Sequence, residues 1–431
     1  MNPAAAPVNY SDLVPGGAHS NSRLRGGRPL VASSAVGSRV IDRDGNEFVD
    51  YIMGNGSVVL GHAAPQVVAA VSDCARRGLT TGFESTFAMK AAELLCSLIP
   101  EPGMVRFTTT GTEAVLHSLD IARAATGRRR FAKAEGSYHG WASPLNVSTW
   151  PTPAEWGPAD HPNPVPGAAG VAESSREVVI FPFNDLDHTE KLLTEWESDL
   201  AAVLIEPILI DVGYVPAERE FLVGLRELTR RIGCLLIFDE TLTGFRVARG
   251  GARELYGVNP DLTIYGKAIA NGYPLAAVEG RPRLLELTNP LKGGKVGFVG
   301  THNGHAVSVA AAVASLTTLQ DDDTLRRIGE LTRELEAGVG EVAARSAVPV
   351  RFAGAGGHFQ IYFTDQPVRD YRSAAASDAD AYQVFVRECD RAGILYPDNQ
   401  LGHAALSASH SSSDIARLLV ALEQATRGSP E

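Results

Sequence analysis

Apolar and polar positions in the first quarter of the chain predict a small β unit followed by helices. Two short alternating runs between residues 31 and 50 flank Asp44-Gly45, a dipeptide typical of the tight turn in a β-hairpin. After Pro65 the apolar positions take up helical spacing, and the same spacing returns from Ala88 to Leu98. We therefore expect a hairpin and then two helices.

Continuous apolar runs in the middle of the chain predict strands that are buried on both faces. Residues 201–207 and 234–240 are apolar until an acid near the end of each run, and residues 261–267 form a third run. Between the first two, residues 221–232 carry apolar side chains at helical spacing. A strand, a helix and a second strand of this kind are typical of parallel α/β architecture.

The last third of the chain mixes helices and strands. Helical spacing runs from about Thr301 to residue 319, and it returns over 324–344 and from about Ser413. Residues 348–431 therefore predict a smaller α+β unit, which we expect to include the N-terminal hairpin. By contrast, residues 150–174 are rich in Pro, Ala and Gly without any period, which predicts a long surface loop.

Composition and charge narrow the class of protein. Of the 431 residues, 44% are hydrophobic and 21% charged, as in soluble globular proteins, and the net charge of −11 argues against partners such as nucleic acid or anionic membrane. The four cysteines are far apart, and His302 and His305 lack ligating neighbours, so we expect no disulfide framework and no metal site. Because the N-terminus is unlike a signal peptide and no apolar run reaches membrane-spanning length, we expect a cytoplasmic protein.

The strongest candidate chemistry lies in Asp239 and Lys267. Each lies at the end of a predicted strand, where open α/β sheets bind their ligands. Lys267 is one of only six lysines, and its glycine and apolar neighbours favour the neutral, nucleophilic amine. Pyridoxal 5′-phosphate (PLP) would suit both residues, because its aldehyde forms an imine with lysine and its protonated ring nitrogen pairs with a carboxylate. The alternative is a solvated lysine and a helix-capping aspartate.

Three glycine-containing segments could contribute to the same site. Gly111 and Thr112 start a predicted helix whose first N–H groups favour a phosphate, although the segment alone is more typical of an ordinary N-cap. Tyr138 and His139 lie in a loop where an aromatic side chain can stack on a flat ring, although most such pairs only pack. Thr301 lies in a third loop and could bind an anion.

Taken together and in order, these segments resemble a known family. From roughly Val14 to Ile415 the sequence is similar to the class III, fold-type I PLP-dependent aminotransferases. The matching motifs are TGTEA (110–114), YHG (138–140), IFDE (237–240), GFR (244–246), GK (266–267), NGYP (271–274) and GTHNG (300–304). Within the family, VPGGAHSNSR, VLGHAAP, FNDL and ALSASHSSSDI resemble the branch of glutamate semialdehyde aminomutases and β-amino-acid aminotransferases.

The resemblance implies a two-domain α/β fold. The large domain would hold a mainly parallel seven-stranded sheet, and the small α+β domain would come from both ends of the chain. We place the N-terminal part of the small domain at 1–63 and the PLP-binding domain at 64–305. A linking helix and the rest of the small domain would occupy 306–431.

The resemblance also implies PLP as the cofactor and a role for each matching residue. Lys267 matches the catalytic lysine that holds PLP as a Schiff base, and Asp239 matches the partner of the ring nitrogen. Tyr138 matches the aromatic residue that stacks on the ring. The remaining cofactor positions are Thr110, Gly111 and Thr112 in the phosphate-binding turn, together with His139, Asp211 and Thr241.

Further matches concern the partner and the substrate. Thr301 matches a threonine that reaches the phosphate of a partner subunit, which implies a homodimer with shared active sites. Arg23 matches the arginine that binds the substrate carboxylate in this branch, and Asn55 matches a second substrate position. A guanidinium grips a carboxylate with two hydrogen bonds, but a surface role for Arg23 is equally consistent with the sequence.

Departures from the branch fall mainly on the substrate. They are Thr241 for a ring-packing valine, Asp211 for an asparagine, Asn55 for the aminomutase tryptophan, and Gly402 or a neighbour for its substrate-region glutamate. We therefore expect an aminotransferase that moves an amino group between another amino acid, β-amino or bulky, and a keto acid by a ping-pong mechanism. An aminomutase, a PLP decarboxylase or racemase, and a non-catalytic PLP-binding protein remain alternatives.

Overall fold

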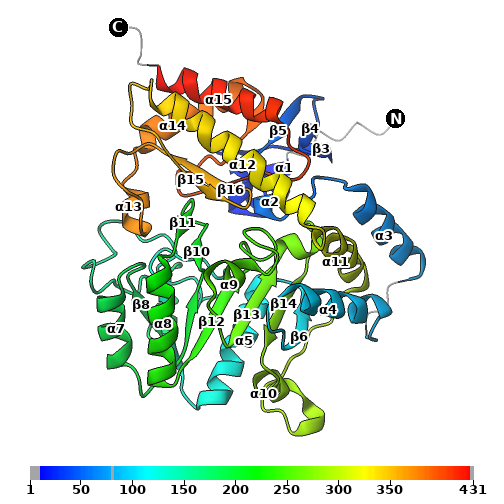
Figure 1. Cartoon of the computed structure of the whole chain (residues 1–431), viewed down its shortest axis with the longest axis vertical. Helices are drawn as coiled ribbons and strands as arrows, with labels where there is room; N and C mark the ends of the chain where they lie inside the picture. The colour runs from blue at the N-terminus through cyan, green and yellow to red at the C-terminus, as the bar shows by residue number, and fades with distance from the viewer. Residues whose placement is uncertain (1–9, 79–81, 428–431) are drawn as a thin grey trace.

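The computed structural model describes residues 10–78 and 82–427, and a central sheet forms its core (Figure 1). In the described residues this sheet has seven strands in the order β6-β14-β13-β12-β9-β7-β8. Only β14 runs antiparallel to its neighbours, so the predicted mainly parallel sheet is confirmed. The strands are β6 (Met104–Thr108), β7 (Arg130–Ala134), β8 (Val178–Phe181), β9 (Leu200–Ile205), β12 (Leu235–Glu240), β13 (Leu262–Gly266) and β14 (Ala276–Gly280).

Burial explains why the middle of the chain is so apolar. Every residue of β9, β12 and β13 is buried, because helices cover both faces of the sheet. The predicted helix between β9 and β12 is α8 (Arg219–Ile232), which buries its apolar stripe and ends at the left-handed Gly233. The other helices of this part are α5 (Gly111–Thr126), α6 (Ala172–Ser175), α7 (Leu186–Glu195), α9 (Gly251–Tyr256) and α10 (Pro282–Leu285).

Three helices form a separate layer beside the sheet. They are α3 (Pro65–Arg76), α4 (Thr86–Leu98) and α11 (Ala306–Leu319), and the sequence predicted all three. Helix α11 packs on α3, on α4 and on a 3₁₀ turn (Lys267–Ala270) that follows β13. The Ser315 hydroxyl donates to the Ala268 carbonyl at 2.9 Å, so this layer supports the turn that begins at Lys267.

The two ends of the chain meet in smaller sheets. Strand β17 (Ile394–Leu395) pairs in parallel with β5 (Glu47–Asp50), which continues through β4 (Arg39–Asp42) to β3 (Ala32–Val36). The predicted hairpin at Asp44-Gly45 is confirmed, with Gly45 at φ +89°. A second small sheet contains β15 (Arg351–Ala355), β16 (His358–Tyr362) and β18 (Ala404–Ala405). The short pairs are β1 (Leu24–Arg25) with β2 (Arg28–Pro29), and β10 (Ile208–Leu209) with β11 (Val215–Pro216).

Helices complete this second part of the molecule. They are α1 (Tyr10–Leu13), α2 (Met53–Gly56), α12 (Asp322–Ala343), α13 (Tyr371–Ala375), α14 (Ala379–Arg391) and α15 (Ser412–Thr426). Figure 1 shows β3, β4 and β5 beside α15, so both chain ends build one unit. The exact domain limits at 63/64 and 305/306 stay a prediction, and residues 1–9 and 428–431 lie outside the described residues.

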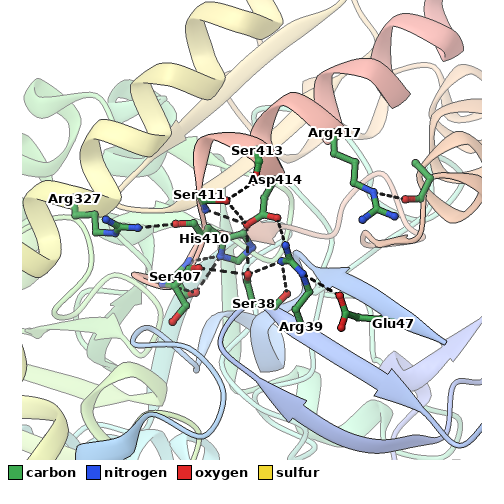
Figure 2. Close-up of polar contacts among 12 residues, drawn as sticks. Ser38, Arg39, Glu47, Arg327, Ser407, His410, Ser411, Ser413, Asp414 and Arg417 are labelled. Atoms are coloured by element: carbon green, nitrogen blue, oxygen red, sulfur yellow. Dashed lines mark hydrogen bonds and ion pairs between the residues drawn. The ribbon is translucent and has the colours of Figure 1, made fainter. Parts of the chain in front are cut away.

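A polar cluster joins these two ends (Figure 2). We call it the terminal cluster: Ser38, Arg39, Ser411 and Asp414. Arg39 Nη2 donates to Asp414 Oδ1 at 2.6 Å, and Arg39 Nη1 donates to the Ser38 hydroxyl at 2.7 Å. The Ser411 N–H and hydroxyl both donate to Asp414 Oδ2 at 3.0 Å, which caps α15. The cluster therefore ties strand β4 to the start of the C-terminal helix.

Residues 150–174 contain little regular structure, as predicted, and all four cysteines are free. Across residues 10–78 and 82–427, none of the helices combines the length and apolar character needed to cross a membrane. In those same ranges no three or more His, Cys, Asp or Glu side chains are grouped as metal ligands.

Candidate functional site

A cavity of about 1020 Å³ lies at the carboxyl ends of the central strands. Residues that follow β6, β7, β9, β12 and β13 all line it, because parallel strands end at the same edge of the sheet. Eleven of the twelve residues predicted for the site line this cavity: Arg23, Asn55, Thr110, Gly111, Thr112, Tyr138, His139, Asp211, Asp239, Thr241 and Lys267. Thr301 does not line it; it is exposed in a loop before α11.

Lys267 and Asp239 come from neighbouring strands. Asp239 lies level with Ile264 in the β12–β13 pairing, and Lys267 follows three positions later, immediately after β13 ends. The backbone of Lys267 has φ +47°, a left-handed conformation that a lysine adopts only at a cost. The 3₁₀ turn and its contact with α11 hold it there, and strain of this kind is typical of functional positions.

Asp239 is buried and is hydrogen-bonded on both oxygens. The hydroxyl and the backbone N–H of Thr241 donate to Oδ1 at 2.5 and 3.1 Å, and His139 Nδ1 lies 2.8 Å from Oδ2. Burial lowers the pKa of His139 more than Asp239 raises it, so the ring is neutral and donates its Nδ1 proton to Asp239. Thr241 thus orients Asp239, and valine at this position would lack the hydroxyl bond.

The start of α5 provides donors for an anion-binding site. Thr110 is the N-cap, and its hydroxyl is used in a capping box with Glu113, whose carboxylate also accepts the N–H groups of Thr109 and Thr110. The N–H groups of Gly111 and Thr112, at the first helical positions, have no partner within the helix. The favourable dipole end and these two donors therefore suit a phosphate better than the Thr110 side chain does.

Sequence analysis missed three residues that hold the aromatic wall of the cavity. The Trp150 ring stacks on Tyr138 with centroids 5.8 Å apart, and its Nε1 donates to the Asp211 carbonyl at 3.0 Å. Glu206 accepts the Tyr138 N–H at 3.0 Å. Lys133 is fully buried and donates to the carbonyls of the loop between Tyr138 and Trp150.

The missed residues also carry unusual electrostatics. Burial, reinforced by the charges of Asp211 and Asp239, raises the pKa of Glu206 well above its ordinary value, so Glu206 is neutral. Burial lowers the pKa of Lys133 to about 7, against the attraction of Glu206. Glu206 directly follows β9, and Asp239 is the last residue but one of β12. An acid near the end of a continuous apolar run was therefore a sequence signal that could have identified Glu206.

Asp211 faces a histidine that sequence analysis did not single out. His403 lies next to Gly402, and its Nδ1 is 3.5 Å from Asp211 Oδ1. Burial opposes ionisation of Asp211, but His403 and the positive charge of Lys267 outweigh it and lower the Asp211 pKa. Burial lowers the pKa of His403 despite Asp211, so the histidine is neutral beside an ionised carboxylate.

The predicted substrate residues lie at the mouth of the cavity. Arg23 and Asn55 are both exposed there, and Arg23 has no ion-pair partner among the described residues. Asn55 follows Gly54 in a left-handed stretch of α2, with φ of +53° and +60° respectively. These positions are compatible with substrate contacts, which stay a prediction.

The donor set fits PLP. The helix start at Gly111 and Thr112 supplies N–H donors for a phosphate, Tyr138 offers a flat face, and Asp239 offers a carboxylate whose hydrogen-bonding partners leave its charge in place. Lys267 opens onto the same cavity as the amine for the aldehyde.

Among curated proteins, the chain is similar to aminomutases. It is 34% identical over 419 residues to a glutamate-1-semialdehyde 2,1-aminomutase from Aquifex aeolicus, with 96% of this chain and 97% of that protein covered. It is 35% identical over 417 residues to a glutamate-1-semialdehyde 2,1-aminomutase 2 from Brevibacillus brevis, with 96% and 95% covered.

Among solved structures, the chain is similar to transaminases. An omega-transaminase from Sphaerobacter thermophilus has a TM-score of 0.91 at 33% identity, with 96% of this chain and 94% of that chain covered. A transaminase with PLP bound has a TM-score of 0.87 at 30% identity, with the same coverage. A β-phenylalanine aminotransferase from Variovorax paradoxus has a TM-score of 0.85 at 28% identity, with 96% and 91% covered.

The family model for class-III aminotransferases matches residues 23–397, which include the central sheet, most of the cavity lining and most of the second unit. The predicted resemblance, the fold-type I architecture and PLP as cofactor are thereby confirmed. The chain belongs to the class-III aminotransferase family of PLP-dependent enzymes.

Proposed function

We propose that the chain is an aminotransferase that moves an amino group between an amino acid and a keto acid in two half-reactions. The observation that carries the proposal is the placement of Lys267 and Asp239 at neighbouring strand ends in one cavity. Bound PLP supplies an aldehyde that takes up amines and a protonated ring that accepts the electrons of a substrate carbanion.

Each protein residue has a defined task in this proposal. Asp239, oriented by Thr241 and His139, keeps the ring nitrogen protonated. With PLP bound, the Lys267 amine would act as the base that takes the proton from the amine-bearing carbon of the substrate. Because the first half-reaction leaves the amino group on the enzyme, the second substrate must be a keto acid.

We infer that the amino donor is a β-amino acid. Arg23 at the cavity mouth is suited to hold its carboxylate, and Tyr138 and Trp150 offer an aromatic wall for an apolar substituent. The similarity to the β-phenylalanine aminotransferase supports this substrate class. We further propose a cytoplasmic homodimer in which Thr301, exposed and outside the cavity of its own chain, reaches the phosphate site of the partner.

Replacing Lys267 tests the proposal directly. We expect Lys267→Ala to lose turnover by about 10⁴-fold or more and to lose the borohydride-fixed PLP adduct, because no other lysine lines the described cavity. Lys295→Ala, at an exposed position, is the matched control and should keep both. An unchanged adduct in the Lys267 variant would contradict the assignment.

A second candidate is an aminomutase, because the curated relatives carry that name. The departures at Asn55, Asp211 and Gly402 argue against the same substrate. A panel of α-, β- and ω-amino donors, assayed with and without a keto acid, separates the two. A transaminase needs the keto acid for repeated turnover, whereas an aminomutase turns over without it.

A further inference from the structure

Few cations line the cavity, and most of them already have a partner or a role. Among the described lining residues they are Arg23, Arg25 and Lys267. Arg25 is already engaged, since one of its nitrogens donates to the Tyr396 carbonyl and the other lies 2.9 Å from Asp390 Oδ1. Lys267 serves the cofactor in the proposed function. Of the lining cations in the part of the chain that the structure describes, Arg23 is therefore the one left to hold a substrate carboxylate.

Asp211 is one of the carboxylates that line the cavity, together with Asp398 and with Asp239, which the proposed function assigns to the cofactor ring. The Asp211 side chain keeps 22% exposure to the cavity, and Lys267, which shares this cavity, lowers its pKa. Its partner His403 is 4% exposed and does not cancel the charge, because burial keeps that ring neutral. Asn55, by comparison, brings no charge to the same cavity.

The surroundings of Asp211 offer no compensation to a second anion. His403 packs edge-on against His358 with ring centroids 5.1 Å apart, and burial lowers the pKa of His358 well below its ordinary value. Trp150 donates its ring N–H to the backbone of Asp211, and Leu401 and Gly402 complete this side of the lining. The two cations near this corner, among the described residues, are already engaged. Lys267 serves the cofactor in the proposed function, and buried Arg246 donates to the Leu406 and Gly56 carbonyls. A carboxylate placed here would therefore face the charge of Asp211 and neutral histidine rings.

We propose that Asp211 excludes substrates with a second carboxylate, so that both the amino donor and the amino acceptor are monocarboxylates. The inference rests on the proposed transaminase function. One carboxylate binds Arg23, and any other carboxylate extending from the reacting carbon toward His403 meets Asp211. Two like charges a few ångströms apart in a partly buried site weaken binding by about tenfold or more.

Binding of unreactive acids tests the charge effect without any turnover. The holoenzyme is titrated calorimetrically with propionate and with glutarate, which have one and two carboxylates. We expect wild type to bind propionate about tenfold or more tightly than glutarate, and Asp211→Asn, nearly identical in shape, to bring the ratio close to one. Asp211→Glu, which keeps the charge, should keep the preference. The control Asp160→Asn removes the same charge from an exposed loop position outside the cavity and should leave the ratio unchanged.

Turnover then separates this inference from the proposed function. We expect a higher kcat/KM with pyruvate than with 2-oxoglutarate as acceptor, and a ratio that falls about tenfold in Asp211→Asn. Equal use of both acceptors by wild type, or equal binding of propionate and glutarate, overturns the role of Asp211. Selective binding without transamination of any donor would instead remove the proposed function and leave the charge selection in place.

Discussion

Two regions of this molecule hold buried or half-buried carboxylates whose partners differ. In the terminal cluster, Asp414 pairs with Arg39 and accepts both Ser411 donors. In the cavity, Asp239 pairs with His139 and Asp211 with His403, and burial keeps both histidines neutral. The first arrangement cancels charge within the chain and stabilises the fold. The second leaves negative charge that a cofactor cation or Lys267 can satisfy, which suits binding better than stability.

The largest expected effect is a loss of activity when Asp239, in the cavity, is replaced. Asp239→Asn should lower kcat/KM by about 10²–10⁴-fold, because a neutral amide no longer holds the ring nitrogen protonated. Thermal unfolding of the cofactor-free protein should not become easier, since the variant removes a buried charge that has only a neutral partner. A variant that loses stability while keeping activity would reverse the distinction between the two regions.

The terminal cluster should show the opposite pattern. Arg39→Met leaves Asp414, 3% exposed, without its cation and should lower the free energy of unfolding by about 2–4 kcal/mol with kcat unchanged. The matched control is Arg43→Met, whose pair with Asp44 at 3.8 Å is 71% exposed on both sides and should matter by less than about 0.5 kcal/mol. Urea unfolding of both variants measures the difference. Equal losses of unfolding free energy would mean that the buried pair stabilises the fold no more than the exposed pair does.

Measurements of stability against pH should sharpen the contrast, because the pKa values of Asp414 and Glu206 are shifted in opposite directions. Burial raises the pKa of Asp414, but Arg39 and Ser411 outweigh it, so its stabilisation is present above about pH 4 and is lost as the pH falls through the lowered pKa. The pKa of Glu206 is raised, so its contribution is present below about pH 4.3 and is lost as the pH rises through the folded value.

Glu206→Gln isolates the second of these effects. Above about pH 4.3 the stability of wild type should decline relative to the variant by at most about 1.4 kcal/mol per pH unit, because only wild type can ionise on unfolding. Urea midpoints of the cofactor-free proteins between about pH 5 and 7 measure the trend. A difference that stays constant across this range would mean that Glu206 is ionised in the folded protein.

The smallest expected effect concerns the aromatic wall. Trp150→Phe removes the N–H bond to the Asp211 carbonyl and part of the stack on Tyr138, so the PLP dissociation constant should rise about two- to tenfold. Fluorescence titration of the cofactor-free protein measures it. Trp196→Phe, a tryptophan outside the cavity, should leave PLP affinity as it is in wild type. A larger loss in that control would assign the effect to tryptophan replacement in general.

The sequence by itself determined the elements and the cofactor chemistry. Continuous apolar runs marked β9, β12 and β13, because strands covered on both faces have no polar side to alternate with. Asp239 and Lys267 lie near the ends of such runs. Because the carboxyl ends of parallel strands lie at the same edge of a sheet, the sequence predicted that the two residues would meet there. The hairpin at Gly45 followed from local turn chemistry.

Only the tertiary structure decided which distant residues meet. His403 comes to Asp211 and Arg39 to Asp414 from far along the chain, and no local spacing encodes those pairings. Burial then set the charge states, because desolvation makes His139 and Glu206 neutral. Local pattern depends on the neighbours of a residue along the chain, whereas the pKa of a site depends on everything packed around it.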